Sequence, residues 1–318
     1  MPQKLRRLRH PGAIAALGQD ALWRLSANGA EPPELTWPIA AETARAVQVT
    51  WPVQRADRGL LEPVCRELER LVHVTRSEMP QPEGNILVFE FAVDGTRFPV
   101  GIDYEDRTVL HERADDLPLL LKHQYAAGGY GRENVEPGGF LTLARDLYAL
   151  YPRLRALRAR TRPRHDLYGR FSTLYAAEVR SRAVTLLETQ RRFSFRGGLE
   201  PVLWSEFVRE ACGARLCLDL PGRGPFCYRL VEYLALGCPV VGLRHAAEMH
   251  VPLVDGRHID YAREDLHDLV DVAARRLADD AGLEALGRGA ADYFDRFLHP
   301  RQLAAYYLDR CLDAARRR

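Results

Sequence analysis

Residues 216–241 read LCLDLPGRGPFCYRLVEYLALGCPVV, and this stretch decides the expected fold. The apolar run Leu216–Leu220 is typical of a buried strand, and the glycines and prolines that follow it predict a loop. Helical spacing over Tyr228–Leu236 predicts a helix, which Gly237 is placed to end because glycine readily adopts the left-handed C-cap conformation. A second apolar strand is expected over Cys238–Leu243. A strand, loop, helix and strand in this order form one unit of a doubly wound parallel sheet.

The same alternation of strands and helices extends on both sides of this unit. Further strands are predicted at His165–Gly169, Phe193–Gly198 and Ile259–Tyr261, and helices at Tyr175–Gln190, Trp204–Cys212, Asp265–Leu277 and Leu283–Phe297. We therefore place a parallel-sheet domain at residues 159–298 and a C-terminal helix at residues 299–318.

The first part of the chain predicts a smaller α/β domain over residues 1–158. Strands are expected at Ala46–Trp51, Asn85–Phe91 and Phe98–Asp103, with a helix at Leu60–Val72. The arginine-rich stretch Tyr151–Arg164 is interpreted as the connection between the domains, and it reads equally well as an exposed helix end. The basic residues 1–18 predict a solvated helix, with a helix lying on a membrane or a partner as the alternative.

The composition is that of a soluble globular protein. Of the 318 residues, 47% are hydrophobic and 28% are charged, a balance that argues against long disorder. The 45 basic and 43 acidic residues leave a net charge of +2, which gives no general attraction to nucleic acid. No apolar run predicts a transmembrane helix. The 6 cysteines lack the spacing of a zinc site, so we expect a reduced, cytoplasmic protein.

The loop and helix of residues 216–241 have the features of an anion site. A helix N-terminus carries free N–H groups and partial positive charge, and Gly222 and Gly224 allow close approach of a ligand to the backbone. Arg229 lies in the first turn, where a cation opposes the helix dipole unless an anion is its partner. Glu232 follows on the same face, placed to bind ribose hydroxyls while Arg229 holds a diphosphate. The alternative is a surface ion pair between Arg229 and Glu232.

These residues resemble the C-terminal half of exostosin-like and related glycosyltransferases of the GT-B architecture. Such enzymes show a strand, a Gly-rich or polar loop, an R-L-x-E helix, a glycine and a Pro-Val strand start. The matching residues here are Arg229, Leu230, Glu232, Ala235, Gly237, Pro239 and Val240, with Gly222 and Gly224 in the loop and a donor-side turn at Pro252–His258. The resemblance covers residues 165–318.

The resemblance implies two Rossmann-like α/β domains that face a cleft, with a C-terminal helix that crosses back to the first domain. It implies a hexosyltransferase-like enzyme that moves a sugar from a UDP- or GDP-type nucleotide sugar to an acceptor. We expect a small molecule, peptide or glycan as the acceptor in preference to nucleic acid. No cofactor and no metal are expected, because arginine, lysine and helix dipoles meet the diphosphate charge in such enzymes and no DxD motif stands at a strand end.

One departure from the family leaves the stereochemistry of transfer open. Many retaining members have two glutamates separated by seven residues, and Gly224 stands where the first would be. The sequence therefore identifies a donor side without deciding between retention and inversion.

Further site residues are assigned from topology, because ligands of doubly wound sheets bind beyond the carboxyl ends of strands. On the donor side, Arg170 is a candidate diphosphate contact or a surface arginine, and Gly197 and Gly198 border a nucleobase site or form a plain turn. The candidates for the catalytic base in the first domain are Asp103, Asp106 and His123, each of which has a structural role as its alternative. The neighbouring Lys122 is a second candidate for the diphosphate, and His245 and His250 are candidates for bounding the sugar pocket.

Two other functions remain open at this point. A nucleotide-sugar epimerase on the same fold would need acidic catalytic residues in the cleft, whereas this cleft is expected to be rich in arginine. A non-catalytic nucleotide-sugar-binding partner fits the missing glutamate and the unassigned base, while Arg229 and Glu232 favour an enzyme.

Overall fold

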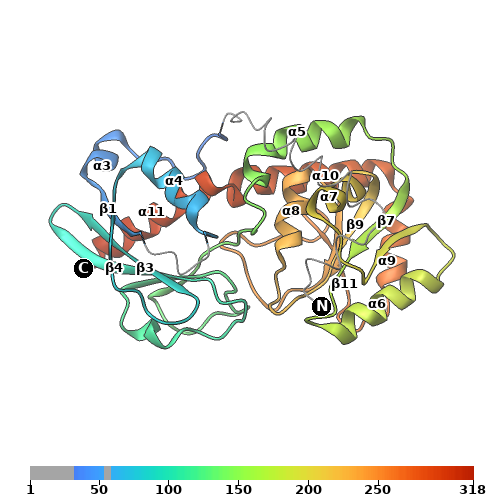
Figure 1. Cartoon of the computed structure of the whole chain (residues 1–318), viewed down its shortest axis with the longest axis horizontal. Coiled ribbons are helices and arrows are strands. Elements are labelled where there is room, and N and C mark those ends of the chain that lie inside the picture. Colours follow the sequence, from blue (N-terminus) through green and yellow to red (C-terminus); the bar gives the residue numbers. More distant parts are fainter. Residues whose placement is uncertain (1–31, 54–58) are drawn as a thin grey trace.

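The computed structural model describes residues 32–53 and 59–318. The helix predicted over residues 1–18 lies outside the described residues. Two sheets organise the described chain, one in each half, and helices pack against both (Figure 1).

The first half contains a six-stranded mixed sheet in the order β2-β1-β3-β4-β5-β6. Its strands are β1 (Gln48–Pro52), β2 (His73–Ser77), β3 (Ile86–Val93), β4 (Thr96–Asp103), β5 (Leu119–Lys122) and β6 (Val135–Pro137). β3 runs antiparallel to β1 and β4, and the other pairs are parallel. Two residues, Asp94 and Gly95, join β3 to β4 with φ of 48° and 81°, the positive values of a tight hairpin turn. This hairpin makes the sheet mixed, so the first half departs from an all-parallel Rossmann-like sheet.

The C-terminal helix α11 (Pro300–Arg316) packs on the first half, against α4 (Glu62–Leu71) and β5. In Figure 1, α11 runs back from the second half to the end of the molecule that carries α3 (Ala41–Ala46) and β1. Tyr306 and Tyr307 donate hydrogen bonds of 2.9 and 2.7 Å to the carbonyls of Pro137 and Gly138. These contacts show that α11 returns to the first half, as the sequence predicts.

The second half contains a five-stranded parallel sheet in the order β11-β10-β9-β7-β8. Its strands are β7 (His165–Arg170), β8 (Phe195–Gly198), β9 (Ala214–Asp219), β10 (Val240–Leu243) and β11 (Asp260–Ala262). Counted along the chain, the order is 2-1-3-4-5, which is a doubly wound topology. The chain reverses its direction across the sheet between β7 and β9, and ligands bind at this switch point in such sheets.

Helices predicted from the sequence cover this second sheet. They are α6 (Ala177–Thr189), α7 (Trp204–Cys212), α8 (Tyr228–Leu236), α9 (Leu269–Leu277) and α10 (Asp280–Tyr293), which continues into a π-helical turn at Phe294–Leu298. α8 has the predicted bounds, and Gly237 ends it with φ of 65°, the left-handed C-cap expected for this glycine.

The stretch interpreted as the connection between domains is largely helix α5 (Leu147–Arg160), which packs against α8. The predicted boundary at residue 158 falls inside this helix. Arg155 donates to the carbonyl of Ala235 at 2.7 Å, and Arg158 donates to the carbonyls of Ala211 and Ala214 at 3.0 Å. These arginines therefore attach α5 to the second half, and one continuous apolar core extends through both halves.

Gly197 in β8 allows β7 and β8 to approach each other closely near their carboxyl ends. A Cβ on Gly197 would overlap the carbonyl oxygen of Gly169 on β7, whereas a Cβ on Gly198 would have no atom within 4 Å. Both glycines have positive φ, 146° and 116°. We expect Gly197→Ala to lower the free energy of unfolding by about 1–3 kcal/mol more than Gly198→Ala, because only the first adds steric overlap to backbone strain. Urea denaturation measures both, and equal losses would contradict the close approach.

Candidate functional site

Asp219 and Arg229 form a buried ion pair at the switch point. Asp219 is the last residue of β9, and Arg229 lies in the first turn of α8. The Arg229 Nη1 is 3.1 Å from Asp219 Oδ1, and its guanidinium lies 4.6 Å from the ring centre of Phe171, which follows β7. The partner of Arg229 is therefore Asp219, and Glu232 has a different partner.

A second arginine, Arg180 of α6, points to the same place. It donates to the carbonyls of Pro221 at 2.9 Å and Ser172 at 2.7 Å, and its Nη2 lies 3.3 Å from Cys227 Sγ. Only 4% of Arg180 is exposed, and within the described part of the chain it forms no ion pair with a carboxylate. Burial and the nearby Arg229 lower the pKa of Arg180. Arg180 was not predicted as a site residue, because helical spacing alone does not indicate which groups an arginine side chain contacts.

Gly222 allows the loop after β9 to fold onto these groups. A Cβ at Gly222 would lie 2.7 Å from Cys227 Sγ and 3.3 Å from Arg180 Nη2. The glycine is thus required for the close approach that the sequence suggested, although the neighbour here is Arg180. Cys227 precedes α8, and no side chain caps the first turn of that helix.

His245 lies just after β10 and reaches the other oxygen of Asp219. Its Nε2 is 3.6 Å from Asp219 Oδ2, its Nδ1 is 3.1 Å from the hydroxyl oxygen of Tyr261, and its ring centre lies 4.6 Å from that of Phe226. A cavity of about 350 Å³ adjoins this histidine. Its lining includes Ala127, Phe226, Arg244, Glu248, Met249 and Leu253. The predicted neighbour His250 lies elsewhere, against Trp37 and Tyr306.

Glu232 faces the connection between the halves. Its Oε1 accepts a hydrogen bond of 2.7 Å from the hydroxyl of Thr142, and its side chain is buried in α8. Burial raises the pKa of Glu232 to about 7. Leu230, also named by the family pattern, is fully buried in the core.

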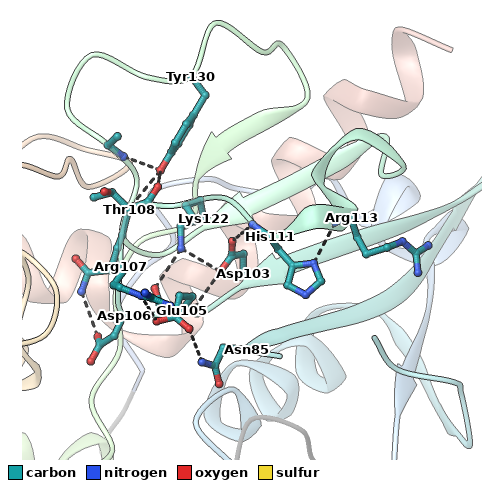
Figure 2. A network of polar contacts seen from close by, with 12 residues as sticks. Asn85, Asp103, Glu105, Asp106, Arg107, Thr108, His111, Arg113, Lys122 and Tyr130 are labelled. Carbon is teal, nitrogen blue, oxygen red and sulfur yellow. Dashed lines mark hydrogen bonds and ion pairs between the residues drawn. The ribbon is translucent and has the colours of Figure 1, made fainter. Parts of the chain in front are cut away.

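Asp103 and Lys122 form a buried ion pair that holds the loop after β4 (Figure 2). Lys122 Nζ donates to Asp103 Oδ1 at 3.0 Å and to the carbonyl of Glu105 at 3.1 Å. Asp103 also accepts backbone N–H groups of Glu105 and His111 at 3.0 and 3.1 Å. Both charged side chains are completely buried, and burial lowers the pKa of Lys122. In this structure the two side chains hold the loop after β4 in position.

Asp106 is the predicted catalytic residue that lies at the junction of the halves. Its Oδ1 accepts from Gln124 Nε2 at 3.3 Å, and a Cβ on Gly224 would overlap its carbonyl oxygen. Gln124 also donates to the carbonyl of Phe226 at 2.9 Å and accepts from its N–H at 3.0 Å. Burial raises the pKa of Asp106. The loop between β9 and α8 is thus attached to the first half beside a carboxylate whose pKa is raised.

His123 and Arg170 are each occupied by structural partners. The Nε2 of His123 lies 3.2 Å from the hydroxyl oxygen of Tyr307 in α11, and burial lowers the pKa of His123 to about 3, which keeps it neutral. Arg170 pairs with Glu210 through two hydrogen bonds of 2.5 and 2.8 Å and is only 9% exposed. The contacts of His123 and Arg170 are therefore with Tyr307 and Glu210, and not with Arg229.

Residues 32–53 and 59–318 contain no cluster of three or more histidine, cysteine or acidic side chains arranged to hold a metal ion. None of the helices in that part of the chain has the length and apolar character needed to cross a membrane.

No protein-family model matches this chain, and no curated protein matches it. Among solved structures, it is similar to one titled "Crystal Structure of TarM", with a TM-score of 0.39 and 10% sequence identity. The alignment covers 64% of this chain and 44% of the other, so it spans less than half of that structure. A likeness with this TM-score and identity does not show the exostosin-like family.

The Asp103–Lys122 pair should be a major source of stability for the first half. We expect Lys122→Met to lower the free energy of unfolding by about 3–5 kcal/mol, because it leaves a buried carboxylate without its cation. The double variant Asp103→Asn with Lys122→Met removes both charges and should recover part of this loss. Denaturant unfolding of the single and double variants measures the effect, and a single variant as stable as wild type would contradict the pairing.

Glu232 should make stability depend on pH. The pKa of Glu232 is about 7 in the folded protein, against an ordinary value of 4.5. Between these values the folded state binds more protons than the unfolded state, so the stabilising contribution of the protonated carboxyl is lost as the pH rises through this window. Glu232→Gln should therefore be more stable than wild type by up to about 3 kcal/mol near pH 8, and by less than about 1 kcal/mol near pH 5.

Denaturation at several pH values measures this difference. Glu188→Gln, on the exposed part of α6, is the matched control and should show no such trend. A Glu232→Gln difference that is constant with pH would show that the carboxyl is not protonated in the folded protein.

Proposed function

We propose that this protein is a metal-independent glycosyltransferase that binds the diphosphate of a nucleotide sugar at the switch point of its second sheet. The observation that supports the proposal is the convergence of Arg180 and Arg229 beyond the carboxyl ends of β7 and β9. This is the edge at which doubly wound sheets bind ligands. The first turn of α8, which no side chain caps, adds backbone N–H groups at the same place.

The balance of charge at this point favours an anionic ligand. Arg229 pairs with the carboxylate of Asp219, whereas Arg180 binds carbonyl oxygens and a sulfur and pairs with no carboxylate of the described chain. The diphosphate of a nucleotide sugar carries two negative charges and matches two arginines. In glycosyl transfer the leaving diphosphate gains charge, and fixed cations that stabilise this charge accelerate the reaction.

The other parts of the proposed reaction are assigned to neighbouring features. The cavity beside His245 has the size of a small-ligand site and combines aromatic with polar walls, so we assign the transferred sugar to it. Asp106 is the proposed catalytic base, because it lies at the junction of the halves and burial raises its pKa. A ribose contact of Glu232 would require its carboxyl to exchange Thr142 for the ligand.

A thermal-shift screen of UDP- and GDP-sugars, UDP and GDP tests the donor site. The wild-type protein should be stabilised by at least one of them, by about 2.7 kcal/mol at a hundredfold excess over Kd. Arg180→Ala should remove most of this shift, because it deletes a cation that neutralises no carboxylate. Arg229→Ala should remove it as well, with a lower melting temperature before any ligand is added, because Asp219 loses its partner.

The control is Arg192→Ala, which removes a half-exposed arginine of the second half and should keep the full shift. Stabilisation by none of the ligands, or equal stabilisation of the arginine variants and wild type, would refute the donor site. Incubation with the stabilising donor then separates an enzyme from a non-catalytic partner. An enzyme should release the nucleoside diphosphate, and Asp106→Asn should abolish this release.

A further inference from the structure

We infer that binding of the donor diphosphate is coupled to the uptake of a proton by His245, through an exchange of ion-pair partners at Asp219. The inference rests on the proposed function, since it concerns the same diphosphate. It assigns to His245 a positioning role: the histidine takes over the carboxylate that Arg229 leaves when Arg229 turns to the ligand.

Asp219 has two neighbouring partners, Arg229 and His245, and Arg229 forms the closer contact. Asp219 is 1% exposed, and Arg229 Nη1 lies 3.1 Å from its Oδ1. The buried Oδ2 has no hydrogen-bond partner in the described part of the chain, and His245 Nε2 lies 3.6 Å away. A separation of 3.6 Å is too long for a hydrogen bond but short enough for an ion pair once the imidazole is charged.

Binding of a diphosphate should change this arrangement. In the proposed exchange, Arg229 turns its guanidinium from Asp219 to form a forked contact with the phosphate oxygens. Asp219 would then be a buried carboxylate without a cation, which is strongly unfavourable. Protonation of His245 supplies the missing cation without moving the backbone of β9 or β10, since the two side chains already lie side by side.

The path of the proton is defined by the two ring nitrogens. We assign the neutral ring the tautomer with Nε2–H toward Asp219, so that Nδ1 accepts from the hydroxyl of Tyr261, 3.1 Å away. The added proton, taken from solvent in the adjoining cavity, binds to Nδ1. The Tyr261 hydroxyl then turns and accepts from Nδ1–H, because a hydroxyl serves as donor or acceptor. One N–H bond forms, and no other bond changes.

The charged groups around His245 are consistent with histidine as the titrating residue. The groups that face it or its partners are Asp219, Arg229, Arg244, Glu248, Asp255 and Tyr261. Burial raises the pKa of Tyr261, so its hydroxyl keeps its proton. Arg244 lies over the Tyr261 ring and 3.8 Å from Asp255, which offsets its charge. Histidine is the side chain that ordinarily exchanges a proton between pH 5 and 8.

Calorimetric titration with a nucleotide sugar tests the coupling. The probe is the UDP- or GDP-sugar that stabilises the wild-type protein, because its two phosphates do not themselves titrate near neutral pH. Titrations at about pH 7 in two buffers of different ionisation enthalpy report the number of protons taken up. We expect a measurable uptake of up to about one proton per donor, and binding that weakens as the pH rises, by up to about tenfold per pH unit.

The variants separate this coupling from the donor site itself. His245→Gln should still bind the donor, more weakly than wild type near pH 6.5, and should take up no proton. His267→Gln, which removes an exposed histidine near α9, should behave as wild type. Asp219→Asn removes the carboxylate that needs a partner, and it should also abolish the uptake; its melting temperature without ligand shows whether it is folded.

The possible results distinguish two failures. A protein that binds no donor refutes the proposed function. Donor binding with the same heat in both buffers, or uptake that persists in His245→Gln, leaves the donor site standing and overturns the role of His245.

Discussion

The buried contact between Asp219 and Arg229 is the interaction on which the arrangement of the second half depends. It joins the end of β9 to the first turn of α8 and fixes the direction of the loop between them. A buried carboxylate is tolerated only with a charged or hydrogen-bonded partner, so the loop has little freedom while the pair is intact. Arg180 adds to this constraint by binding the carbonyls of Pro221 and Ser172 on both sides of the switch point.

The first half extends this constraint across the junction. The buried Asp103–Lys122 pair holds the loop after β4, and that loop carries Asp106 to the backbone of Gly224. Gln124 then binds both backbone groups of Phe226. The loop between β9 and α8 is therefore supported by both halves, and its position depends on the packing of the first sheet.

Local features of the chain could be predicted from the sequence, but contacts between distant residues could not. The bounds of α8 and the left-handed Gly237 follow from helical spacing and glycine chemistry, which are local. The sequence predicts a diphosphate as the partner of Arg229, with a surface ion pair to Glu232 as the alternative, whereas the structure brings Asp219 to Arg229 across a loop of prolines and glycines. Likewise, Asp103 is typical of a strand-end acid by pattern, and only the fold shows that Lys122 and two backbone N–H groups saturate it. The Asp94-Gly95 pair is itself typical of a tight hairpin, so the antiparallel pairing of β3 with β4 could be predicted from the sequence.

The charges near the switch point are the reason for proposing an anion site at this edge of the second sheet. Arg170 also follows a parallel strand, but Glu210 neutralises it with two hydrogen bonds, so it offers no charge to a ligand. Burial raises the pKa of Glu232 to about 7, so this carboxyl is partly protonated near neutral pH and adds less than a full negative charge. Arg180 satisfies its N–H groups with carbonyl oxygens and a sulfur, which solvate the guanidinium without cancelling its charge. The excess positive charge is thus held in a low-dielectric setting, where its attraction for an anion is stronger than it would be at the surface.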